Sequence, residues 1–529
     1  MNVQRRTFLG TAVAGVSTLA NLRPAVAATR FPYLETTIAQ LQAQLHTGKL
    51  TTRKLAGAYL ARIDEIDRRG PKLNSVIELN PDAMAISAEL DRERNAGKVR
   101  GPLHGIPIVL KDNIATADRM ATTAGSLALI GAKPPRDAFV AARLRAAGAL
   151  ILGKANLSEW ANIRSPRSTS GWSGRGGMTR NPYALDRSAS GSSSGTAVSV
   201  AANLAVAGIG TETDGSIISP ASICGIVGFK PTVGLVSRDG IVPISRSQDT
   251  AGPMTRSVED AAILLSVIAG SDPRDETTAG APAPADYMKA LDAQGLHGAR
   301  LGVVRSLRIR HADVAALFDA QLAVLRAAGA ELVDPVEVQN VAKIGPYELE
   351  VLLTELKAGL NAYLAEFGNG AKVRTLADVI AFNETHHERE LPLFGQELFM
   401  QAQAKGDLTN TTYLEALANS RRFAGAEGLD AAFKEHRVDA LVAPSGGLAW
   451  LFDPVNGDAS TGNFSTPAAV AGYPHLTIPM GFVAGLPAAL SFVGPAWSEA
   501  TLLRYGFAFE QATKARRAPA FPRSVTPKV

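Results

Sequence analysis

The stretch from Ser188 to Pro231 reads SASGSSSGTA, then the apolar run VSVAANLAVAGIG, then TETDGSII, and it ends in GIVGFKP. Two loops of small residues are therefore separated by enough apolar residues for one helix and one strand. Each loop offers a serine, Ser192 in the first and Ser216 in the second. Because glycine has no Cβ, such turns let backbone N–H groups converge on one point. Acyl-transfer enzymes need that arrangement to stabilise an oxyanion.

A flexible Gly/Ser linker is the competing interpretation of the same stretch. The segment 197–210 argues against it, because it contains Val198, Val200, Leu204 and Ile209. A linker would not alternate with buried elements of this kind. Further along, Ser219-Pro220 has the pattern of a cap followed by the first position of the next helix, which predicts that Ser216 lies just before a helix N-terminus.

Three motifs resemble those of the amidase signature family, and they occur in that family's order. The segments are 105–113 (GIPIVLKDN), 190–195 (SGSSSG) and 210–217 (GTETDGSI). They are similar to the family's lysine segment, its Gly-Gly-Ser-Ser-Gly-Gly block and its nucleophile loop. The resemblance continues through 249–254 (DTAGPM) to 471–474 (AGYP), so it covers most of the chain after the first 27 residues.

The resemblance implies a catalytic triad of Lys111, Ser192 and Ser216. Ser216 would be the nucleophile, Ser192 the bridging serine and Lys111 the base, since a serine hydroxyl needs a base and a neutral lysine can serve through a second hydroxyl. The resemblance also implies a cis peptide bond between Gly191 and Ser192. The implied oxyanion hole consists of four consecutive backbone N–H groups, those of Thr213, Asp214, Gly215 and Ser216.

Lys111 directly follows the apolar run Gly105–Leu110, which fits a buried strand. A lysine in that position can extend its amine to the surface. If it stays buried, its pKa falls and it can accept a proton near pH 7. The carboxylate of Asp112 would oppose that fall in pKa if it faced the amine, and the sequence leaves its orientation open.

Departures from the common family pattern bear on the substrate. Asp214 replaces a glycine, and Ile218 and Ser219 stand where many members carry an arginine that in some holds a substrate carboxylate. Without that bidentate clamp, substrates with a free carboxylate beside the amide are disfavoured. Asp214 either accepts a substrate N–H group or satisfies amides of its own loop. The form TETDGS resembles the peptide-amidase branch, which removes C-terminal amides.

Several alternatives remain open at this stage. The segment 191–195 also matches the G-x-S-x-G elbow of α/β-hydrolases, with Ser193 as nucleophile, although no strand pattern precedes it. An aryl or aliphatic acylamidase or an esterase of the same family is a second possibility. A non-catalytic amide-binding protein, which would form no acyl-enzyme, is a third.

Residues 1–27 resemble a cleavable twin-arginine export leader, with Arg5-Arg6 near the start and Ala25-Val26-Ala27 at the end. We expect a periplasmic protein without a stable membrane anchor, because the run from Phe8 to Leu22 is shorter than the roughly 20 apolar residues of a membrane span. The formal charge of +5 comes without basic runs interleaved with aromatic residues, so nucleic acid is not an expected partner. No Cys/His cluster has metal-binding spacing, so we expect neither a metal nor a cofactor.

The resemblance implies an α/β fold in which residues 28–529 form a single amidase domain around a central mixed β-sheet flanked by helices on both sides. The signature core would span about residues 100–260, and helix-patterned residues of about 340–437 would cover the substrate cleft. Within that region, five leucines predict one apolar helix face that is more often core than groove: Leu349, Leu352, Leu353, Leu356 and Leu360. Trp450 and Phe452 could line the substrate pocket or anchor a loop. We expect a small-molecule or peptide amide as partner, and a monomer or homodimer.

Overall fold

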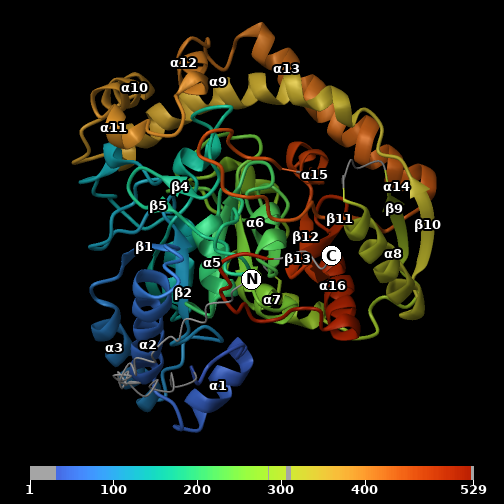
Figure 1. Ribbon diagram of the computed structural model, residues 1–529, viewed down its shortest axis with the longest axis horizontal. Coiled ribbons are helices and arrows are strands. Elements are labelled where there is room, and N and C mark those ends of the chain that lie inside the picture. The colour runs from blue at the N-terminus through green and yellow to red at the C-terminus, as the bar shows by residue number, and fades with distance from the viewer. Residues whose placement is uncertain (1–30, 284, 306–310, 461, 526–529) are drawn as a thin grey trace, which may run out of the picture. The chain divides into compact units, whose positions relative to one another are not determined.

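An 11-stranded mixed β-sheet runs through the protein, in the strand order β1-β3-β2-β6-β8-β7-β12-β13-β11-β9-β10. The computed structural model describes residues 31–283, 285–305, 311–460 and 462–525, and Tyr33–Val529 form one unit (Figure 1). The strands of this sheet are β1 Val76–Leu79, β2 Pro107–Lys111, β3 Leu150–Ala155, β6 Ala207–Glu212, β7 Val227–Lys230, β8 Thr250–Thr255, β9 Arg300–Val304, β10 Glu331–Val336, β11 Ala440–Pro444, β12 His475–Val483 and β13 Leu486–Val493. A separate two-stranded sheet pairs β4 Trp172–Ser173 with β5 Gly177–Met178.

Helices flank the sheet and extend beyond it. The α-helices are α1 Ile38–His46, α2 Thr52–Arg62, α3 Ala83–Asn95, α4 Phe139–Ala146, α5 Ser194–Ala201, α6 Ile218–Ile223, α7 Val258–Ile268, α8 Ala312–Ala327, α9 Val341–Phe367, α10 Leu376–Thr385, α11 His387–Glu390, α12 Glu397–Gln403, α13 Thr411–Arg421, α14 Asp430–His436, α15 Thr466–Ala471 and α16 Glu499–Thr513. Two π-helices extend α2 and α13, η1 Ile63–Arg69 and η6 Arg422–Leu429, and the 3-10 turns are η2 Leu127–Leu129, η3 Glu159–Asn162, η4 Glu276–Gly280 and η5 Tyr287–Ala290. No helix in the described ranges is long and apolar enough to cross a membrane.

Strand β2 occupies an interior position of the sheet and ends at the candidate lysine. All five of its residues are buried, and it pairs in parallel with β3 on one side and β6 on the other. Such doubly covered parallel strands are near-continuous apolar runs, as this one is. Because Leu110 pairs with Ile209, the carboxyl ends of β2 and β6 lie together. This register brings Lys111 beside Thr211.

The predicted α/β fold with a central mixed sheet is confirmed. The segment between the two small-residue loops forms α5 and then β6, as its apolar pattern predicts. The prediction for the start of the next helix is wrong by two residues: α6 begins at Ile218, so Ser219 and Pro220 lie in its first turn. The physical reason is that the carboxylate of Glu212 accepts the N–H groups of Ile217 and Ile218, at 2.7 and 2.9 Å, and so replaces the expected serine cap.

The region 340–437 forms the helices α9 to α14, together with η6. Figure 1 shows α9 and α13 running side by side, with α10, α11 and α12 near one end of α9. The predicted leucine face of α9 is only partly buried. Leu353, Leu356 and Leu360 are buried, whereas Leu349 is 41% exposed. The remaining leucine of the face, Leu352, lines a cleft that is described below.

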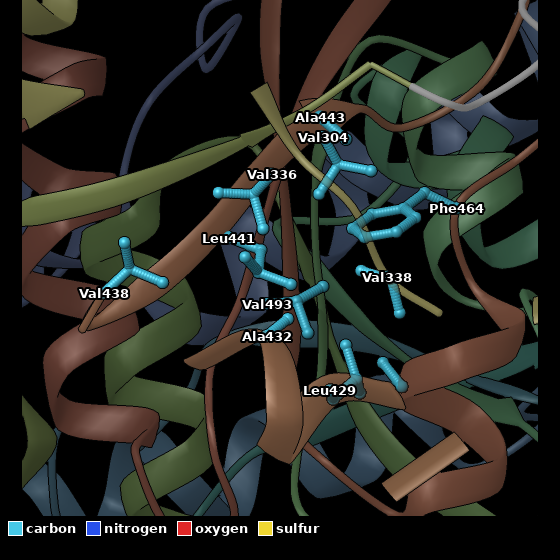
Figure 2. Packing of buried hydrophobic residues seen from close by; sticks show 11 residues of the cluster. Val304, Val336, Val338, Leu429, Ala432, Val438, Leu441, Ala443, Phe464 and Val493 are labelled. Atoms are coloured by element: carbon cyan, nitrogen blue, oxygen red, sulfur yellow. The ribbon is translucent and has the colours of Figure 1, made fainter. Parts of the chain in front are cut away.

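One apolar cluster fixes a loop that reaches the candidate site. Figure 2 shows Phe464 packed among side chains of β9, β10, β11 and β13 and of the helical segment that follows η6, including Val304, Val336, Leu441 and Val493. Phe464 immediately precedes Ser465 and the first residue of α15, Thr466. Burial of the aromatic ring therefore holds the start of α15 in place.

The close packing of α5 predicts a large effect of one small substitution. A Cβ at Gly195 would lie 2.3 Å from the backbone oxygens of both Ser75 and Asn156. We expect Gly195→Ala to cost about 3 kcal/mol or more of folding free energy, since backbone atoms on two sides cannot yield easily. Gly57→Ala is the matched control, because nothing lies within 4 Å of its Cβ and alanine favours the interior of α2 by about 0.5–1 kcal/mol. Thermal unfolding of both variants checks this, and equal melting temperatures would contradict it.

Candidate active site

The amine of Lys111 is enclosed at the carboxyl end of β2. Its Nζ donates to Ser192 Oγ at 2.8 Å, to Thr211 Oγ1 at 2.9 Å and to Thr211 O at 3.1 Å. The side chain is completely buried, and desolvation lowers the pKa of Lys111 to about 7, although the negative charges of Asp249 and Glu212 oppose the change. A large fraction of the amine is therefore uncharged at neutral pH and can accept a proton.

The carboxylate of Asp112 turns away from the lysine that precedes it. Its Oδ2 accepts the hydroxyl of Thr123 and lies 3.5 Å from Arg175, which forms an ion pair with it. The side chain of Asp112 therefore does not hold Lys111 in the charged form. The sequence had left this orientation open.

Ser192 and Ser193 are neighbours with different surroundings. The Gly191–Ser192 peptide bond is cis, as the family resemblance implied. Ser193 is fully buried; its Oγ donates to Thr211 O at 3.0 Å and accepts from Thr211 N at 3.2 Å. Both functions of the Ser193 hydroxyl are thus used to join α5 to β6. A hydrolase elbow would also need a histidine, and one of the later histidines, His475, is buried in β12 and bonded to Ser491.

Ser216 lies on the loop between β6 and α6. It is 8% exposed and lines a cleft of about 280 Å³. Gly215 precedes Ser216 and has a φ of +76°, a backbone conformation that glycine adopts without strain. A Cβ at this position would also lie 2.9 Å from Ser465 Oγ, so a larger residue would be crowded. In the part of the chain that the structure describes, four consecutive N–H groups of this loop donate no hydrogen bond: those of Thr213, Asp214, Gly215 and Ser216. Unpaired backbone N–H donors beside a cleft can stabilise an oxyanion that forms there.

A second buried carboxylate, Asp249, shapes the same loop. Its Oδ1 accepts the hydroxyl of Thr213 at 2.5 Å, and its Oδ2 accepts the N–H groups of Ile244 and Ser245 at 2.8 and 2.9 Å. Burial raises the pKa of Asp249 to about 6, while these hydrogen bonds hold it lower than burial alone would. The sequence alone points to no role for Asp249, although this residue begins the segment DTAGPM.

Asp214 points toward the start of α15 and toward α9. Its Oδ2 accepts the hydroxyl of Thr466 at 2.6 Å, and the hydroxyl of Ser465 also lies beside the carboxylate and stabilises its charge. Desolvation raises the pKa of Asp214. Desolvation and the nearby Asp214 charge raise the pKa of Glu348 to about 8, against a hydrogen bond from Gln248. The Asp214–Glu348 pair therefore holds a proton more tightly than two separate exposed carboxyl groups would. Neither Glu348 nor Gln248 was recognisable from the sequence.

The cleft brings together most of the predicted site residues. Asp214, Ser216 and Trp450 line it, as does Leu352 of α9, so the helical region contributes a wall. The indole Nε1 of Trp450 donates to Asp458 Oδ1 at 3.0 Å, which fixes the ring. Phe452 is separated from this group, because it lines another cavity and is 37% exposed. Within the described residues, no cluster of three His, Cys, Asp or Glu side chains could hold a metal ion.

Comparisons with protein families, with related sequences and with solved structures identify the family of this chain. A family model described as Amidase matches residues 55–503. A probable amidase of Arabidopsis thaliana is 42% identical over 504 residues, covering 93% of this chain and 92% of the relative. The crystal structure of native peptide amidase from Stenotrophomonas maltophilia is 54% identical with a TM-score of 0.89, covering 93% of this chain and 99% of that one.

A further solved structure, that of the peptide amidase PAM in complex with the competitive inhibitor chymostatin, is 54% identical and has a TM-score of 0.90. It covers 92% of this chain and 99% of the other. Family model, relatives and structures therefore agree over nearly the whole described chain. The protein belongs to the amidase family and is an amidohydrolase that matches the peptide-amidase branch.

Proposed function

We propose that the protein hydrolyses C-terminal peptide amides or small neutral amides through an acyl-enzyme on Ser216. The contact of Lys111 Nζ with Ser192 Oγ is the observation that carries the proposal. It joins a base whose pKa is about 7 to a hydroxyl on the loop that packs against the nucleophile loop. The backbone supports this arrangement, because Ser193 N donates to Ser216 O at 3.1 Å.

The proposed reaction is a sequence of two acyl transfers. Ser216 Oγ attacks the amide carbonyl carbon while its proton moves to Ser192 and the Ser192 proton moves to Lys111. The free N–H groups of residues 213–216 stabilise the oxyanion. The C–N bond then breaks, and the nitrogen leaves as ammonia with a proton returned through Ser192. Water attacks the acyl-enzyme by the same route and releases the carboxylic acid.

Substrate selection is proposed to depend on Asp214. Asp214 lines the cleft beside the nucleophile loop, and its carboxylate suits the N–H group of an uncharged amide. Position 218 carries isoleucine, so no arginine at that point holds a carboxylate. Trp450 supplies an aromatic wall for the acyl part of the substrate. We propose no cofactor for the reaction.

Esterase or acylamidase activity of the same site is the alternative within the family, because the triad would treat an ester carbonyl in the same way. A non-catalytic amide-binding protein is the alternative of another class, and the enclosed Lys111–Ser192 pair argues against it. We further propose that the protein works in the periplasm. That rests on the leader at residues 1–27, which lies outside the described residues.

The first test is ammonia release from C-terminally amidated peptides and simple aliphatic and aryl amides. We expect peptide amides to react fastest, and Lys111→Ala and Ser216→Ala to lose at least about 10³-fold in kcat/KM. Ser193→Ala is the matched control: it loses contacts with Thr211, so it should unfold more easily yet keep activity within about tenfold. Faster turnover of simple amides would overturn the peptide preference. Activity that survives in Ser216→Ala but disappears in Ser193→Ala would overturn the mechanism.

The pH dependence of kcat/KM provides a second prediction. Activity needs the unprotonated amine, so kcat/KM should fall as the pH drops through about 7, the pKa of Lys111. The negative charge of Asp249 favours the ammonium form, so Asp249→Asn should lower the Lys111 pKa and move this acid limb to lower pH. An amide oxygen at this position can still accept from Ile244 and Ser245.

The control for this shift is Asp313→Asn, which removes an exposed carboxylate from the first turn of α8. We expect its pH profile to match that of the unaltered protein. An acid limb that stays in place in Asp249→Asn, or moves to higher pH, would contradict the assignment of the limb to Lys111.

A third prediction concerns Asp214. Asp214→Ala removes this carboxylate from the cleft, and we expect kcat/KM for primary amides to fall about tenfold, in line with the loss of one hydrogen bond to a charged group. The corresponding methyl esters have no N–H group to donate. Their hydrolysis by Asp214→Ala should therefore change less than amide hydrolysis does. Equal losses for esters and amides would assign Asp214 to the loop structure alone.

A further inference from the structure

A second cavity, larger than the active-site cleft, has a wall dominated by cations. It has a volume of about 750 Å³, and five of its lining residues are basic: Arg68, Lys72, Arg180, Arg187 and Arg523. We call it the basic groove. Its residues come from η1, from the loops after η1 and β5, and from the C-terminal tail. Three segments far apart in the sequence thus place like charges around one space.

Most of these cations form no ion pair with another described residue. Arg68, Lys72, Arg180 and Arg523 are exposed, and among the described residues their side chains take part in no ion pair. Arg187 is partly buried and donates to the backbone oxygen of Ala449 at 2.6 Å, which fixes its guanidinium but leaves its charge uncompensated. Like charges held around one cavity raise the local concentration of anions.

The acidic residues of the groove do not neutralise it. Asp67 is buried, and its carboxylate is occupied by the N–H and hydroxyl of Ser75 and by the N–H of Val76, at 2.6 to 3.1 Å. Asp186 is the other carboxylate of the lining. Five cations therefore face two carboxylates, and Asp67 also interacts with the charge of Arg68. The lining keeps an excess of positive charge, which fits an anionic ligand.

A short extended segment connects the basic groove to the active-site cleft. Trp450 lines the cleft with Ser216, whereas Phe452, two residues on, lines the groove. The segment is held by antiparallel bonds: Ser188 N donates to Trp450 O at 2.8 Å, and Phe452 N donates to Asp186 O at 3.0 Å. Two extended residues span roughly 7 Å. Trp450 of the cleft lining and Phe452 of the groove lining are therefore within this distance of each other.

We propose that the basic groove is a remote subsite for the substrate, which binds acidic side chains roughly three to six residues before the C-terminal amide. This inference rests on the proposed peptide-amide activity and names the peptides it favours. A peptide whose amide reaches Ser216 passes Trp450 and Phe452 and brings its upstream residues to Arg180 and Arg523. Phe452 then supports the peptide at the entrance to the groove.

The test uses hexapeptide amides that differ only in the fourth residue before the amide, with Glu, Gln or Lys. We expect the Glu peptide to have roughly three- to tenfold higher kcat/KM than the Gln peptide at low ionic strength, mostly through KM, because this contact is equal in ground and transition states. The Lys peptide should be the poorest. Added salt should reduce all three differences, since these charges are exposed to solvent.

The double variant Arg180→Gln/Arg523→Gln should treat the Glu and Gln peptides alike and keep the unaltered kcat for the Gln peptide. Arg53→Gln is the matched control, because Arg53 is an exposed cation about 20 Å from Arg68 along the continuous helix of α2 and η1. It should keep the preference for Glu. Equal kcat/KM for Glu and Gln peptides in the unaltered protein would overturn the inference.

Binding to the inactive Ser216→Ala variant separates this inference from the proposed activity. Dye-labelled Glu and Gln peptide amides would be titrated by fluorescence anisotropy. Tighter binding of the Glu peptide, lost in the double arginine variant, supports the groove even where peptide amides are not hydrolysed. If peptide amides are hydrolysed but both peptides bind equally, the groove proposal is wrong and the proposed activity stands.

Discussion

Removal of the Lys111 amine from water is the constraint on which the site depends. Desolvation lowers its pKa to about 7, but burial alone does not make a base. Lys154 and Lys230 are equally buried, and burial lowers the pKa of each to about 8. The amine of Lys154 donates to Ile114 O and Thr122 Oγ1, and that of Lys230 to a backbone oxygen. Of the three, Lys111 is the one that contacts a serine hydroxyl, that of Ser192, and the residue before it, Gly191, lines the cleft.

Two buried carboxylates give the nucleophile loop its shape. Glu212 accepts N–H groups that follow Ser216, and Asp249 accepts a hydroxyl before it and N–H groups of a neighbouring loop. Both carboxylates thus hold the flanks of the loop and leave the N–H groups of residues 213–216 without partners. The same charges raise the Lys111 pKa that burial lowers, so the structure of this loop and the proton affinity of Lys111 are coupled.

The sequence predicted those features that local pattern and family motifs encode. The helix and strand between the serine loops, and the positions of Lys111, Ser192 and Ser216, follow from motifs in one order along the chain. Features that depend on contacts between distant segments were not predictable. Glu212 replaces the cap expected at Ser219 because a strand end meets a helix start, and Leu352 lines the cleft because one face of α9 passes over it. Trp450 and Phe452 are two residues apart in sequence, yet they line different cavities.

The most direct test of the account is to locate the covalent adduct formed with a serine-directed fluorophosphonate, by mass spectrometry of the digested protein. The account predicts modification at Ser216 in the unaltered protein, and little modification at neutral pH in Lys111→Ala and Ser192→Ala, because both remove the proton path. It predicts normal labelling in Ser193→Ala. An adduct on Ser193, or labelling of Ser216 that is equally fast without Lys111, would contradict the central claim.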